Sequence, residues 1–97
     1  MSPAPTHSSV VTREFTVRNQ YGIHARPAAL LVKTASGFAS EILIEREGNS
    51  VSAKSIMGLL TIEGYKGSVL KVTARGPDAE KAVGAIGELF EKKFFED

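Results

Sequence analysis

The 97-residue chain contains no cysteine and no tryptophan, and only two histidines, His7 and His24. Without cysteine, disulfide bonds, thiolate nucleophiles and thiolate metal sites are all excluded. No charge of one sign dominates either, because 12 lysines and arginines oppose 11 acidic residues, for a net charge of +1. That balance gives no electrostatic reason to expect a nucleic-acid partner or an acidic lipid surface. We therefore expect no nucleic acid, no metal and no cofactor.

Long apolar runs are also missing. No segment approaches the roughly 20 apolar residues of a membrane-spanning helix, and the first nine residues lack the basic start and the apolar stretch of a signal peptide. We therefore expect no membrane insertion and a cytoplasmic location. Residues 1–9 hold two of the four prolines and no large aliphatic side chain, which predicts a mobile tail with His7 as a spectator. Residues 10–97 are then expected to form a single domain.

The composition that remains is globular, with 42% hydrophobic and 24% charged residues. Alternating or apolar runs bounded by turn residues predict strands at residues 14–18, 40–45, 50–53 and 68–73. Helical spacing predicts three helices: one with Pro27 in its first turn and a stop at residues 36–37, one at residues 56–60, and one that follows Asp78 as its cap and extends to Phe94. Gly84 and Gly87 in the last helix would permit close approach to the sheet.

This β-α-β-β-α-β-α order predicts an α+β fold. Strands that alternate polar and apolar residues bury one face of an antiparallel sheet, and the helices cover that face. We therefore expect an open-faced β-sandwich, in which a four-stranded antiparallel sheet carries three helices on one face.

The segment 22–27, Gly-Ile-His-Ala-Arg-Pro, places His24 and Arg26 where a loop meets a helix. Ala25 is expected at the cap position, and because it has no side-chain acceptor, the first-turn N–H groups stay available to an anion. Arg26 adds a guanidinium suited to phosphate. The pattern is compatible with nucleophilic attack by His24 on a phosphoryl group, with the product held by the N–H groups of Ala25 and Arg26. The plain alternative is a loop histidine beside a solvated arginine.

Two segments resemble the HPr family, the histidine-containing phosphocarriers of the bacterial phosphoenolpyruvate:sugar phosphotransferase system. Segment 22–28, Gly-Ile-His-Ala-Arg-Pro-Ala, matches the active-site signature of that family, and segment 54–58, Lys-Ser-Ile-Met-Gly, resembles its regulatory serine segment. The resemblance extends over residues 14–90 and includes the element order. It implies that His24 is phosphorylated on Nδ1, that Arg26 neutralises the phosphate, and that Ser55 is a site of regulatory phosphorylation.

The resemblance also implies a carrier rather than a stand-alone enzyme. His24 would take the phosphoryl group from enzyme I, which is charged by phosphoenolpyruvate, and pass it to enzyme II A domains for sugar uptake and phosphorylation. Further implied partners are an HPr kinase/phosphorylase that acts on Ser55 and a transcriptional regulator. We expect a monomer. The alternative is a regulatory docking module that Ser55 phosphorylation controls, with little or no relay through His24.

The short helix at residues 56–60 is the expected docking surface. Ser55 is a good helix cap whether or not it is modified. A helix of barely two turns cannot bury all of its apolar residues, and we expect Met57 and Leu59 to contact partners. Tyr21 and residues 63–65, Glu-Gly-Tyr, differ from the residues common in the family. These positions are expected near the docking region, so they bear on partner choice.

Overall fold

The computed structural model describes residues 9–96 of the chain. Most of the predicted tail, with His7, lies outside these residues. Seven regular elements and one short turn follow each other: β1 (Val10–Thr16), α1 (Ala25–Ala35), β2 (Glu41–Arg46), β3 (Asn49–Ser52), α2 (Ile56–Thr61), β4 (Val69–Arg75), α3 (Ala79–Glu91) and η2 (Lys93–Phe95). No helix in the described part of the chain has the length and apolar character needed to cross a membrane.

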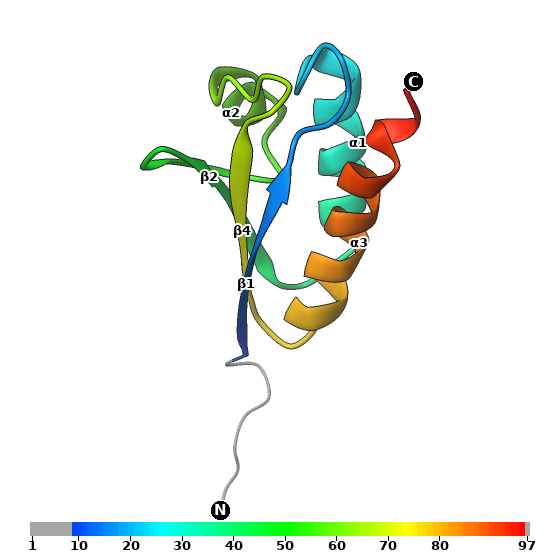
Figure 1. The fold of residues 1–97 in the computed structure, drawn as a ribbon. Helices are drawn as coiled ribbons and strands as arrows, with labels where there is room; N and C mark the ends of the chain where they lie inside the picture. Colours follow the sequence, from blue (N-terminus) through cyan, green and yellow to red (C-terminus); the bar gives the residue numbers. More distant parts are fainter. Residues whose placement is uncertain (1–8, 97) are drawn as a thin grey trace, which may run out of the picture.

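The strands form one antiparallel sheet in the order β1-β4-β2-β3. Helices α1 and α3 lie together against one face of the sheet, and α2 packs on α1 at one end (Figure 1). The predicted α+β open-faced sandwich and its element order are confirmed. The strand ends differ from the predicted ones, since β1 begins at Val10 and β4 continues to Arg75. The additional residues of β1 and β4 pair with each other, as Val10 does with Arg75. The alternation pattern of one strand alone does not reveal this pairing.

The core lies between the sheet and the two long helices. The apolar stripe of α3 and η2 is buried throughout, as predicted; its members are Ala79, Ala82, Val83, Ile86, Leu89, Phe90 and Phe94. Phe90 stacks on Phe15 of β1 at 5.3 Å between ring centroids. A Cβ atom on Gly87 would lie 2.6 Å from the Phe15 ring, so glycine is needed there for close approach to the sheet. The same expectation is wrong for Gly84, whose Cβ would meet open space.

Asp78 takes the cap position of α3, but its carboxylate does not cap the helix. Instead it accepts hydrogen bonds from the backbone N–H groups of Ala39 and Ser40 and from the Ser40 hydroxyl. The Ser40 hydroxyl, followed by the Ala39 N–H, lowers the pKa of Asp78 from its ordinary value of 3.8. Asp78 therefore joins the start of α3 to the connection between α1 and β2.

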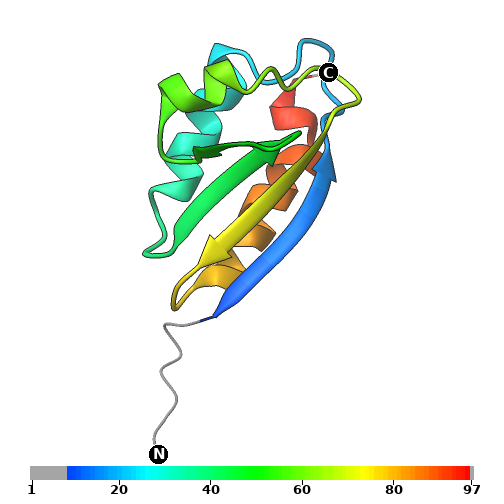
Figure 2. The same cartoon turned by 90° about the vertical axis from the view of Figure 1, so that its left-hand side faces the viewer.

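The loop before α1, helix α2 and turn η2 gather at the same end of the molecule, which the two perpendicular views both show (Figures 1 and 2). Residues far apart in the sequence thus meet around His24.

Candidate functional site

The loop that carries His24 connects β1 to α1 and is held against the loop before β4. Val17 N–H donates to the Ser68 carbonyl at 2.8 Å, and Ile23 N–H donates to the Gly64 carbonyl at 2.9 Å. Gly22 has a φ of 68°, and a Cβ atom there would collide with the Gly64 carbonyl oxygen. The loop therefore depends on glycine at position 22, both for its left-handed backbone and for its contact with Gly64.

Gly64 belongs to the segment 63–65, in the loop between α2 and β4. A Cβ atom on Gly64 would lie 2.8 Å from the Ile23 side chain. The neighbouring Tyr65 is mostly exposed, with the Arg46 guanidinium 5.3 Å from its ring centroid. This segment therefore supports the His24 loop with its backbone while it presents an aromatic ring to solvent.

His24 itself is the N-cap of α1, with extended backbone angles of φ −94° and ψ −164°. The prediction of Ala25 as the cap is wrong by one residue, because Ala25 is already helical. His24 makes no side-chain cap hydrogen bond either, so the cap side chain does not occupy the first-turn N–H groups. The N–H groups of Ala25 and Arg26 precede the first intrahelical donor, Ala28, which donates to the His24 carbonyl at 3.0 Å.

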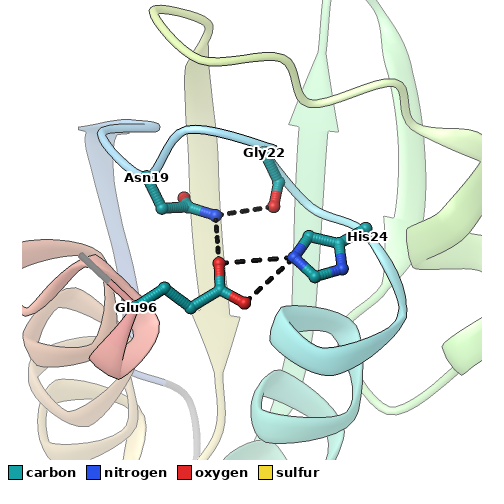
Figure 3. A network of polar contacts seen from close by, with 4 residues as sticks. All are labelled: Asn19, Gly22, His24 and Glu96. Carbon is teal, nitrogen blue, oxygen red and sulfur yellow. Dashed lines mark hydrogen bonds and ion pairs between the residues drawn. The ribbon is translucent and has the colours of Figure 1, made fainter.

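The imidazole of His24 is 41% exposed and meets a carboxylate on one side only. Its Nε2 lies 3.0 Å from Oε2 and 3.3 Å from Oε1 of Glu96. The other ring nitrogen, Nδ1, lies on the side of the ring away from Glu96 (Figure 3). Tyr21, which is mostly exposed, approaches the ring edge-on at 6.3 Å between centroids. Among the residues that the structure describes, Nε2 of His24 is therefore paired and Nδ1 has no hydrogen-bond partner.

Asn19 completes this network. Its Nδ2 donates to the Gly22 carbonyl at 2.7 Å and to Glu96 Oε1 at 3.0 Å (Figure 3). The Asn19 side chain is fully buried, and its Oδ1 has no hydrogen-bond partner among residues 9–96. One amide thus ties the loop backbone to the carboxylate that contacts His24.

The sequence interpretation missed both Asn19 and Glu96. Glu96 reaches the site because the turn η2 follows α3 with a left-handed backbone, with φ values of 54°, 54° and 61° at Lys93, Phe94 and Phe95. Phe94 is fully buried and meets Phe90 edge-on at 5.0 Å, which anchors the turn. The available signal was the extension of the apolar stripe to Phe94, since it implies that the chain stays on the core beyond the end of α3.

Arg26 is exposed and has neither a side-chain hydrogen bond nor an ion pair with another residue of the described range 9–96. Its guanidinium follows His24 by two positions in the first turn of α1. A planar cation and N–H groups that have no partner in the described part of the chain are suited to bind a phosphate.

Helix α2 confirms one prediction and corrects another. Ser55 is its N-cap, and the Ser55 hydroxyl oxygen accepts a hydrogen bond from the Gly58 N–H at 3.0 Å. Met57 is 73% exposed, so it is available for contact. Leu59 is fully buried, and its assignment to the docking surface is wrong because its position on the helix faces the core. Ile56 and Leu60 are partly exposed instead.

No three His, Cys, Asp or Glu side chains within residues 9–96 are grouped so as to hold a metal ion. The groups found around His24 are its imidazole, the Glu96 carboxylate and the backbone N–H groups at the start of α1, with the Arg26 guanidinium two positions further along the chain.

Comparison with known proteins gives consistent matches over most of the chain. The family model described as "PTS HPr component phosphorylation site" matches residues 11–92. Phosphocarrier protein HPr of Treponema pallidum is 44% identical over 88 residues, which cover 91% of this chain and 100% of that protein. A crystal structure of HPr from Thermoanaerobacter tengcongensis superposes with a TM-score of 0.87 at 44% identity and covers 90% of this chain and 98% of that one. A dimeric HPr structure from the same organism gives a TM-score of 0.71 at 47% identity, over 80% and 90% of the two chains.

Proposed function

The chain belongs to the HPr family of phosphocarriers of the phosphotransferase system, and from this premise we propose that His24 Nδ1 is the atom that carries the phosphoryl group. A member of this family is a carrier and not a stand-alone catalyst. The observation that supports the assignment is the asymmetry of the His24 ring, with Nε2 paired to Glu96 and Nδ1 on the opposite side.

The proposed reaction is a direct transfer between proteins. The Nδ1 lone pair forms a bond to phosphorus while the bond from phosphorus to the donor breaks, and the donor keeps that electron pair. Phosphorylated enzyme I, charged by phosphoenolpyruvate, is the proposed donor, and the A domain of an enzyme II is the proposed acceptor. The relay would take place in the cytoplasm, with a monomeric carrier and without a cofactor.

The phosphate would be held by groups that have no other partner within the described chain. The N–H groups of Ala25 and Arg26 lie at the start of an 11-residue helix, where the helix dipole favours an anion. The guanidinium of Arg26 can supply two parallel donors to phosphate oxygens. These groups would stabilise the charge that accompanies the transferred phosphoryl group without any movement of the backbone.

The test is labelling from radioactive phosphoenolpyruvate in the presence of enzyme I. The His24→Ala variant should accept no label, while His7→Ala should be labelled like the parent protein. The label on the parent should be lost in acid, as a phosphoramidate is, and retained in base. Label that persists in His24→Ala would overturn the assignment of His24.

We propose further that Ser55 is a site of regulatory phosphorylation by an HPr kinase/phosphorylase. Its hydroxyl caps α2 beside the exposed Met57, so a phosphate there would add about 1.5 to 2 negative charges next to the proposed docking surface. A phosphate at a helix start is compatible with the fold because it can accept from the same N–H groups. The modification would therefore change docking of enzyme I or of a transcriptional regulator rather than the chemistry at His24.

The matched variants for this site are Ser55→Asp and Ser55→Asn. Both keep an acceptor for the Gly58 N–H, but only Asp adds charge. Ser55→Asp should raise the enzyme I concentration needed for half-maximal labelling of His24, while Ser55→Asn should leave it unchanged. Melting temperatures of the two variants should agree closely. Equal enzyme I dependence for both variants would leave Ser55 with a capping role alone.

A further inference from the structure

We propose that Glu96 is a positioning residue for phosphoryl transfer at His24. Its carboxylate would hold the proton on Nε2, so that Nδ1 presents its lone pair, and would balance the positive charge that the ring acquires when Nδ1 is phosphorylated. This inference rests on the proposed function of His24 and adds a second residue to it, from the opposite end of the chain.

The contact geometry assigns the tautomer. Both carboxylate oxygens of Glu96 lie within hydrogen-bond distance of His24 Nε2, at 3.0 and 3.3 Å. An ionised carboxylate only accepts hydrogen bonds, so Nε2 is the nitrogen that donates. A neutral imidazole carries one N–H, and Nδ1 is therefore left with its lone pair on the ring edge away from Glu96 (Figure 3).

The carboxylate is itself held in place. Asn19 Nδ2 donates to Glu96 Oε1 at 3.0 Å and to the Gly22 carbonyl at 2.7 Å. Since both partners are acceptors, the Asn19 amide must present its NH2 group to them. The Glu96 side chain is only 19% exposed, so its interaction with His24 is less screened than that of a surface ion pair. These are the features by which a second residue orients a reacting histidine.

The backbone that delivers Glu96 is unusual. Lys93, Phe94 and Phe95 all have positive φ values, between 54° and 61°, a region that residues with a Cβ atom rarely adopt. Such a conformation persists where the surroundings hold it, and it often marks a functional site. Here the buried ring of Phe94 holds the turn from one side, and the Glu96 contacts hold it from the other.

The charge balance of the transfer explains what the carboxylate would contribute. When Nδ1 bonds to phosphorus, the ring keeps its Nε2 proton and becomes a phosphoimidazolium, so no proton has to leave. The positive charge on the ring then lies beside the Glu96 carboxylate, which stabilises it through a charge-assisted hydrogen bond. When the phosphoryl group moves on, the ring departs as neutral imidazole and the original tautomer is restored. A buried carboxylate that orients histidine and stabilises the imidazolium works in the same way in acyl-transfer triads.

Two variants and one control separate the parts of this role. Glu96→Gln keeps an oxygen that accepts from Nε2 but removes the charge, whereas Glu96→Ala removes both. Glu91→Gln is the control, because it makes the same charge change on an exposed side chain that forms no side-chain hydrogen bond or ion pair within residues 9–96. Melting curves establish that each variant is folded.

The measurements are imidazole ¹⁵N NMR spectra of the unphosphorylated proteins and initial rates of His24 phosphorylation by enzyme I. We expect Nε2–H in the parent and in Glu96→Gln, and a mixture of tautomers in Glu96→Ala. The rate should fall about 10-fold in Glu96→Ala and about 3-fold in Glu96→Gln, and it should not change in Glu91→Gln. A proton on Nδ1 in the parent, or a Glu96→Ala rate within about twofold of the control, would overturn the role of Glu96. Neither result would affect the assignment of His24, which fails only if His24→Ala is labelled.

Discussion

The contact between Gly22 and Gly64 should control both the stability of the domain and the activity of His24. Gly22→Ala places a methyl group against the Gly64 carbonyl oxygen, at a position whose φ is 68°. Gly48→Ala is the matched control, because Gly48 also has a positive φ, 84°, but a Cβ atom there has no neighbour within 4 Å. The two variants therefore share the backbone cost and differ in the collision.

The expected losses of stability follow from the left-handed backbone and from the collision. An alanine in the left-handed region costs about 1 kcal/mol relative to glycine, and this is the whole effect expected for Gly48→Ala. Forcing a methyl group into a packed contact adds about 1–3 kcal/mol, because the loop must move and the hydrogen bond from Ile23 to Gly64 must lengthen. We expect a loss of about 3 kcal/mol for Gly22→Ala. In a domain of this size the melting temperature then falls by about 12–24 °C, against about 4–8 °C for Gly48→Ala.

Thermal unfolding followed by circular dichroism measures both shifts, and the rate of His24 labelling measures the functional consequence. Gly22→Ala should slow labelling at a temperature where the variant is still folded, because the displaced loop carries His24. Gly48→Ala should be labelled like the parent protein. Equal melting temperatures for the two variants would refute the packing of the His24 loop on Gly64 as the reason for glycine at position 22.

Three further predictions follow from the described contacts. Arg26→Glu should slow phosphorylation of His24 strongly and Arg26→Lys only moderately, because Lys keeps the charge but not the planar pair of donors. Equal initial rates in the labelling assay would show that Arg26 takes no part in the transfer. Leu59→Ala should destabilise the domain by about 2–5 kcal/mol through loss of core packing. Met57→Ala should change stability by less than about 0.5 kcal/mol but weaken binding to enzyme I. Urea unfolding measures the stabilities and titration calorimetry the binding, and the reverse pattern would contradict the burial of Leu59. The hydrogen bonds to Asp78 lower its pKa below 3.8 in the folded state, so its carboxylate stabilises the fold fully above that pH and loses this contribution as the pH falls through the folded-state pKa. Asp78→Asn should therefore have a lower melting temperature than the parent protein at neutral pH, and the difference in melting temperature should become smaller as the pH falls. A constant difference from pH 7 to pH 2 would show that the ionised carboxylate plays no part.

The elements and their order were predictable because each has a local signal. Strand alternation, the Pro27 helix start and the apolar stripe of α3 depend on neighbours within a few residues. The ends of β1 and β4 were not predictable from one strand, since their extra residues are held by pairing with each other. Leu59 was misassigned because a six-residue helix gives too few turns to fix which apolar side chain faces the core.

The residues of the candidate site also divide into those that the local sequence reveals and those that it does not. His24, Ala25 and Arg26 lie in one short segment whose residue types and spacing suggest an anion site, whereas the role expected of Ser55 comes from the resemblance of segment 54–58 to the HPr family. Glu96 joins the site only through a left-handed turn at non-glycine residues, and no residue pattern announces such a turn. Asn19 was overlooked for a related reason, because an asparagine in a loop usually signals a turn, and its contact with Glu96 spans 77 positions of sequence.

The central claim is that His24 Nδ1 carries the phosphoryl group, and the most direct measurement is ¹⁵N and ³¹P NMR of the protein after reaction with phosphoenolpyruvate and enzyme I. The account predicts a single new phosphorus signal, coupled to Nδ1 of His24, while Nε2 keeps its proton. A phosphorus signal coupled to Nε2, or one that remains in the His24→Ala variant, would contradict it.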